Sequence, residues 1–234
     1  KEISRIRLNR LYSENNIFEE ISFHDGVNII LGEKCDESSV KGRKTNGVGK
    51  SMSIEFLDFG FLNDYEKSRI AKIPKEVFPL EENVILDLDI GDEAITIKRN
   101  RKQADQPVII REGKTVSFDK LQDAREYLTG IIFPKLNGKK VPSFRNLFSI
   151  LMRDERSEFA DIIKCHDLTK KIPDDLSAHL FLLGFSLEAY KNTLETIKEI
   201  DAVNTILTKE QKRVDARRKK ENLRCQGRIE CIGR

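Results

Sequence analysis

Two stretches near the middle of the chain alternate between apolar and polar residues, which is the pattern of strands with one buried face. They are residues 84–90 and residues 94–99, and the Gly91-Asp92 pair between them is a turn signal. A third apolar stretch, residues 107–111, follows after a polar turn. The pattern predicts an antiparallel hairpin with a third strand beside it.

The N-terminal part of the chain predicts a second group of strands. Residues 2–8 alternate closely enough for a half-buried strand, and residues 18–23 are a candidate partner strand after a turn. Residues 27–31, Val-Asn-Ile-Ile-Leu, form a short run rich in β-branched side chains, which predicts a buried strand. Together with the helices described next, these strands predict an α/β fold with a mixed or antiparallel sheet.

Apolar side chains spaced by three and four residues predict helices in the second half of the chain. Residues 118–131 and 143–151 each place their apolar side chains on one face. From about Asp175 onward the chain lacks proline, and its apolar residues follow the rhythm of a coiled coil. These positions are Leu183, Leu187, Tyr190, Leu194 and Ile197. Residues 225–234 carry glycines and lose this rhythm, so we expect the helix to break there.

A glycine-rich motif, Lys-Thr-Asn-Gly-Val-Gly-Lys-Ser at residues 44–51, lies between the predicted strand at 27–31 and a further helical pattern. Strand, glycine-rich loop and helix follow one another in this order in a phosphate-binding loop. The glycines let backbone N–H groups face a phosphate, Lys50 reaches the β- and γ-phosphates, and the Ser51 hydroxyl is a ligand for Mg²⁺. A helix that starts near Lys50 adds the positive end of its dipole.

One position departs from the usual motif, which has a glycine where Lys44 stands in this chain. Gly32 or Gly42 can supply the turn if residues 33–43 are an insertion in the loop. As a nucleotide site, the motif predicts ATP and Mg²⁺ as its ligands, with Ser51 on the metal. The residues expected to bind the nucleotide are Asn46, Gly47, Val48, Gly49, Lys50, Ser51 and Met52.

The opening residues 2–34 and the run Thr-Asn-Gly-Val-Gly-Lys-Ser resemble the N-terminal half of an SMC-type ABC ATPase head. The polar insertion before this run and the later stretch at 142–159, which reads PSFRNLFSILMRDERSEF, are more similar to the SMC-like components of bacterial anti-phage defence systems, such as Lamassu and three-component ABC systems. The resemblance covers roughly residues 1–225 and is most specific at the phosphate-binding loop.

The resemblance implies a domain organisation and a set of partners. Residues 1–174 are then the N-terminal lobe of the head, residues 175–224 begin a coiled-coil arm, and residues 225–234 are an atypical terminus. The arm is expected to lead to a C-terminal half of the same ATPase, and a second copy of the head is expected to form a homodimer on ATP. Double-stranded DNA and accessory or effector subunits are the further partners, in genome maintenance or anti-phage defence.

No catalytic residue is assigned from the sequence. Residues 84–93 end in Asp-Glu and imitate a Walker B motif, whose carboxylates bind Mg²⁺ and orient the attacking water. Their alternation and the immediate turn favour a hairpin instead, so Asp92 and Glu93 are not assigned as a catalytic pair. The sequence also lacks the signature motif of ABC ATPases, which in the resembling family lies in the C-terminal half. ATP hydrolysis is therefore expected only from a completed head.

Other functions stay open at this point. A P-loop GTPase would carry an Asn-Lys-x-Asp base reader, which the sequence lacks, and a small-molecule kinase would not need a coiled-coil tail. A structural or interaction subunit that binds nucleotide without turnover stays compatible with the sequence, because Lys44 replaces a glycine of the motif.

Composition and charge add less to the picture. Of the 234 residues, 38% are hydrophobic and 35% are charged, a mixture that suits a globular part joined to a long polar helix. A membrane-spanning run and a signal peptide are both missing, so we expect a cytoplasmic protein that does not enter a membrane. The net charge of +3 argues only weakly for nucleic acid, yet two basic clusters predict weak, sequence-independent DNA binding. They are Lys98, Arg99, Arg101 and Lys102, and Arg217, Arg218, Lys219 and Lys220.

Overall fold

The computed structural model of the chain describes residues 4–31, 50–134, 142–152 and 176–232. The chain separates into two compact units, Lys1–Phe185 and Ser186–Arg234. Within the described residues, no helix is both long enough and apolar enough to cross a membrane.

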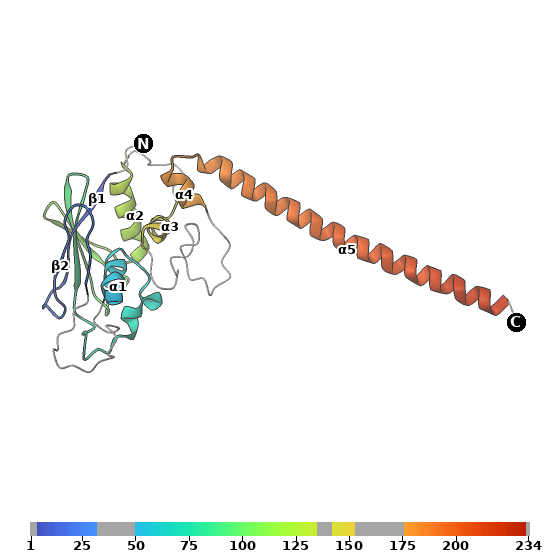
Figure 1. The fold of residues 1–234 in the computed structure, drawn as a ribbon, viewed down its shortest axis with the longest axis horizontal. Coiled ribbons are helices and arrows are strands. Elements are labelled where there is room, and N and C mark those ends of the chain that lie inside the picture. The colour runs from blue at the N-terminus through green and yellow to red at the C-terminus, as the bar shows by residue number, and fades with distance from the viewer. Residues whose placement is uncertain (1–3, 32–49, 135–141, 153–175, 233–234) are drawn as a thin grey trace. The chain divides into compact units, whose positions relative to one another are not determined.

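The first unit is built on a six-stranded antiparallel sheet with the order β2-β1-β3-β4-β5-β6 (Figure 1). Its strands are β1 (Ile6–Ser13), β2 (Ile21–Ser22), β3 (Val84–Ile90), β4 (Glu93–Arg99), β5 (Val108–Arg111) and β6 (Lys114–Ser117). Leu11, Leu86, Ile97 and Ile109 face one another across four neighbouring strands, and all four are fully buried. Their side chains form the centre of the inner face of the sheet.

Helices cover this inner face (Figure 1). The first, α1 (Lys50–Gly60), packs on β3 and β4, and it comes close to β3 at Gly60, where a Cβ would lie 3.1 Å from a Leu86 methyl carbon. Two short 3₁₀ helices follow, η1 (Tyr65–Lys67) and η2 (Arg69–Lys72). Beyond the sheet strands, α2 (Leu121–Ile132) packs on α3 (Phe144–Leu151), and α3 packs on α4 (Ser177–Leu182).

The predicted mixed α/β composition and the antiparallel sheet are confirmed, including the hairpin at 84–99 and the third strand beside it. The first strand runs later than predicted, from Ile6 to Ser13, and the turn comes at residues 14–16, where Asn16 has a φ of 54°. The stretch at 18–23 contributes only the two-residue strand β2. Strand β6 was not predicted, because its residues, Lys-Thr-Val-Ser, are mostly polar and exposed.

The second unit consists of the long helix α5 (Leu187–Ile232). The expectation of one continuous helical region from about Asp175 was wrong, because α4 ends at Leu182 and Gly184 takes a φ of +88° before α5 begins. The expected break after residue 225 was also wrong, since α5 continues through Gly227 to Ile232. A single glycine costs a helix only about 1 kcal/mol, which helix-forming neighbours outweigh.

Candidate nucleotide site

Helix α1 begins at Lys50, where the glycine-rich motif predicts it. Asn46, Gly47, Val48 and Gly49 lie outside the described residues, as does the side chain of Lys50. Ser51 and Met52 stand in the first helical turn with half-buried side chains. The first N–H groups of a helix have no acceptor within it, so this turn is a place where phosphate oxygens can bind. The Ser51 hydroxyl in this turn is the kind of group that binds Mg²⁺ in a phosphate-binding loop.

Contacts along its length fix α1 on the rest of the unit. Glu55 is buried at 4% exposure, and its Oε2 accepts hydrogen bonds from the Ser68 hydroxyl at 3.0 Å and the Arg69 backbone N–H at 3.1 Å. One turn later, Asp58 forms an ion pair with Arg145 of α3 at 2.8 Å. Burial raises the pKa of Asp58, and the Arg145 guanidinium opposes that rise. Both carboxylates therefore hold neighbouring elements against the helix.

The prediction of a strand at residues 27–31 was wrong. These residues have no regular secondary structure, and Val27, Ile29 and Leu31 are 81%, 76% and 74% exposed. The Asn28 side chain instead bonds locally to the turn before it, accepting from the His24 N–H at 2.9 Å and donating to the His24 carbonyl at 2.8 Å. A strand needs a neighbour for its backbone groups, and β1 is already paired with β2 and β3.

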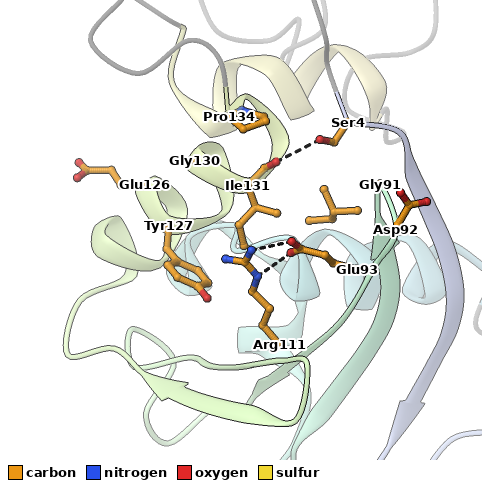
Figure 2. Close-up of a pocket in the computed structure, with 11 residues that line it drawn as sticks. Ser4, Gly91, Asp92, Glu93, Arg111, Glu126, Tyr127, Gly130, Ile131 and Pro134 are labelled. Carbon is orange, nitrogen blue, oxygen red and sulfur yellow. Dashed lines mark hydrogen bonds and ion pairs between the residues drawn. The ribbon is translucent and has the colours of Figure 1, made fainter.

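The Asp-Glu pair that imitates a Walker B motif lies at the turn of the β3–β4 hairpin, as predicted. It borders a pocket of about 540 Å³ between this turn and α2, where Figure 2 shows Glu93 facing Arg111 beside Tyr127. Both Glu93 oxygens are engaged, one by Arg111 Nε at 2.6 Å and the other by Arg111 Nη2 at 2.7 Å. The Glu93 hydrogen bond raises the pKa of Arg111, so this guanidinium stays charged. Glu93 is thus committed to a structural ion pair.

The structure does not bring the first predicted DNA-binding cluster to one surface. Arg99 and Arg101 are buried, at 1% and 6% exposure. Arg101 donates to the backbone carbonyls of Phe78 and Ile73, both at 2.6 Å. The expectation that these two arginines meet DNA phosphates is therefore wrong for this fold. Lys98 and Lys102 are more exposed but lie in ion pairs with Glu14 and Glu81.

The second predicted cluster lies on α5. Arg217 and Arg218 are exposed on this helix, and the side chains of Lys219 and Lys220 lie outside the described part of the chain. Among the residues that the structure describes, no three His, Cys, Asp or Glu side chains are grouped closely enough to hold a metal ion.

The sequence interpretation missed a group of arginines at the far end of α1. Arg99, Arg125 and Arg145 reach this end from β4, α2 and α3. For Arg99 a signal was present, because the two-residue period of β4 places it on the same face as Ile95 and Ile97, which are buried. For Arg125 and Arg145 no sequence pattern indicates which backbone atoms they meet.

Comparison with protein-family models, with curated proteins and with solved structures finds no match to this chain.

Proposed function

We propose that the chain is the ATP-binding N-terminal half of an SMC-like ABC ATPase head. In this proposal, ATP and Mg²⁺ bind at residues 46–52, a C-terminal half completes the head, and two heads dimerise on ATP. The assembly then acts on or senses DNA, in genome maintenance or anti-phage defence. The observation that carries the proposal is the start of α1 at Lys50, directly after the glycine-rich run.

The exposed run at 27–31 supports the proposed C-terminal half. Three large apolar side chains in five residues are more than 70% exposed, in a segment without regular secondary structure. Exposed contiguous apolar surface is typical of an interaction site, and an apolar extended segment gains most when a neighbouring strand pairs with it. A half-head that lacks its partner strands would expose this run immediately before the phosphate-binding loop.

The second unit supports the proposed arm. Helix α5 exposes apolar side chains along its length, among them Ile197 at 47%, Val203 at 55% and Leu207 at 61%. A single helix of this length with an uncovered apolar stripe is more stable when it pairs with another helix. The predicted cluster on the same helix, Arg217, Arg218, Lys219 and Lys220, is the candidate for contacts with DNA phosphates, and Arg217 and Arg218 are exposed.

Nucleotide binding tests the proposal directly. Removing the Lys50 ammonium by Lys50→Ala deletes a charged contact worth about 1.5–3 kcal/mol, so Mg-ATP affinity should fall about 10- to 100-fold. Isothermal titration calorimetry on the purified chain measures this change, with circular dichroism to verify the fold.

Two further variants sharpen the assignment. Ser51→Ala should reduce the affinity for Mg-ATP while leaving the affinity for metal-free ATP in EDTA nearly unchanged, because only the metal contact is lost. Lys102→Ala is the matched control, since this lysine is exposed and distant in sequence from the motif, and it should bind Mg-ATP like the unmodified chain. Equal affinity of Lys50→Ala and the control would reject the proposed site.

A further inference from the structure

Three arginines converge on the last turn of α1, at the opposite end from the candidate phosphate site. Arg99 Nη1 donates to the carbonyls of Phe59 at 2.8 Å and Asn63 at 2.7 Å. Arg125 donates twice to the Leu62 carbonyl, from Nε at 3.0 Å and from Nη2 at 2.6 Å. Phe59 lies in the last turn of α1 and Leu62 and Asn63 follow it, so these guanidinium groups bind both the helix end and the turn after it. We call Arg99, Arg125 and Arg145 the arginine clamp.

The clamp holds a strained backbone. Leu62 is fully buried and has a φ of +60°, the left-handed conformation that usually belongs to glycine at a helix end. Its N–H donates to Phe59 O at 3.0 Å, and the next N–H, of Asn63, donates to Asp58 O at 3.1 Å. These two bonds form a Schellman motif, in which a residue with a Cβ costs about 1–2 kcal/mol. Such a conformation persists only where its surroundings fix it.

Arg145 differs from the other two members because it also binds a side chain of the helix. Its Nη1 donates to Phe61 O at 3.1 Å, and its Nη2 pairs with Asp58 Oδ1 at 2.8 Å. Arg99 and Arg125 meet backbone carbonyls and the segment after α1. The Arg145–Asp58 pair is largely removed from solvent, with side-chain exposures of 21% and 17%. A displacement of α1 along its axis therefore changes this ion pair directly.

Arg145 also belongs to α3, the helix that precedes α4 and the long helix α5 in the sequence. Helix α3 packs on α2 and α4, and α4 ends at Leu182, shortly before α5 begins at Leu187. Arg145 is thus the clamp member that links the candidate nucleotide helix to the elements leading to the long helix. The C-terminal end of α1 and the turn after it contact α3 through the Arg145–Asp58 ion pair, the Arg145 bond to Phe61 O and the packing of the Phe61 and Phe148 rings.

We propose that Arg145 is a positioning residue that couples nucleotide binding at the N-terminal end of α1 to the packing of α3. The inference rests on the proposed function, because it needs a nucleotide at Lys50 and Ser51. Binding draws the first turn of α1 toward the phosphates, and the Arg145–Asp58 contact passes this constraint to α3. Coupling is reciprocal, so loss of the contact weakens nucleotide binding as well.

Hydrogen–deuterium exchange with and without saturating Mg-ATP tests the coupling. In the unmodified chain, nucleotide should slow exchange in peptides covering α1 and also, about threefold or more, in peptides covering α3. Arg145→Ala should keep the effect in α1 and lose it in α3, while its affinity for Mg-ATP falls about fivefold or more. Arg145→Lys keeps the charge and should restore part of both effects.

The outcomes separate the two proposals. No change anywhere on adding Mg-ATP rejects the proposed function, and the coupling with it. A response in α1 that is absent from α3 in the unmodified chain, or that persists in α3 of Arg145→Ala, rejects the coupling alone. A purely structural role would speed exchange equally with and without nucleotide. Asp58→Ala removes the same contact from the α1 side and replaces Arg145→Ala if that variant does not fold, and Lys102→Ala is the matched control.

Discussion

A single buried arginine, Arg99, connects several segments of the first unit through its hydrogen bonds. Arg99 is 1% exposed, and its guanidinium donates to three backbone carbonyls, including Ala104 O at 2.6 Å. It also lies 4.1 Å from the centre of the Phe59 ring, within the range of a cation–π interaction. Burial lowers the pKa of Arg99 to about 9, so the group remains charged at pH 7. Its hydrogen bonds therefore come from a cation.

Replacing Arg99 should be costly. Arg99→Met fills most of the volume but removes a charged donor from each of three backbone carbonyls, so we expect the free energy of unfolding to fall by about 3 kcal/mol or more. Urea denaturation followed by circular dichroism measures this loss. Lys102→Met, three residues later, removes an exposed pair with Glu81 and should leave the unfolding midpoint unchanged. Similar unfolding midpoints for the two variants would mean that the hydrogen bonds of Arg99 do not stabilise the fold.

The burial of Arg99 could be predicted from the sequence, whereas the helix end at Leu62 could not. Strand alternation indicates that Arg99 faces inward, but a count of basic residues groups it with Lys98, Arg101 and Lys102 as a surface cluster. The alternation is the better guide, because a side chain's direction is set by the backbone. The Schellman end at Leu62 has no sequence signal, since glycine is the residue expected there.

The hairpin of β3 and β4 is the element on which the catalytic assignment depends. Gly91 has a φ of +64°, which suits the first central residue of a two-residue hairpin turn. Each residue from Val84 to Ile90 pairs with β4 in register. An apolar run that ends in Asp-Glu is therefore accommodated here in an antiparallel hairpin, with Glu93 in its ion pair with Arg111.

Glu93→Gln distinguishes a structural carboxylate from a catalytic one. In a completed, ATP-hydrolysing assembly, we expect turnover to stay within about twofold, whereas loss of a water-orienting carboxylate typically costs about 10²-fold or more. Stability should fall by about 1 kcal/mol or less, because the pair with Arg111 is partly exposed. Steady-state phosphate release and urea denaturation measure the two effects, and Asp92→Asn is the control at the neighbouring exposed position. A large loss of turnover in Glu93→Gln alone would restore the Walker B interpretation.

Elements with strong periodicity were predictable, and those that depend on distant partners were not. Helices α1, α2 and α3 lie within a few residues of their predicted ranges because their apolar faces repeat locally. The run at 27–31 has the composition of a buried strand, yet composition cannot supply the neighbouring strand that would pair with it. The end of α5 was misjudged because one glycine was given more weight than the helix formers around it.

At the scale of the whole molecule, both units expose apolar residues that folding has not covered. In the first unit they are concentrated at Val27, Ile29 and Leu31, and in the second they recur along α5. Exposed apolar surface of this kind is what a missing partner would bury. Under the proposed function, the C-terminal half of the head is that partner, and it also supplies the carboxylate that the described hairpin does not provide.

The whole-molecule prediction is that this chain alone binds Mg-ATP without hydrolysing it at a meaningful rate. Phosphoryl transfer requires charge neutralisation, which Lys50 and Mg²⁺ would provide, and also a group that orients the attacking water. Glu93 is held by Arg111, and Asp58 is held by Arg145 at the end of α1 away from Lys50, so neither is placed for that task. Steady-state phosphate release from the purified 234-residue chain is the measurement, with Lys50→Ala as the control for contaminating ATPases. Release faster than about one per second, abolished in Lys50→Ala, would show that a complete site is present within these residues.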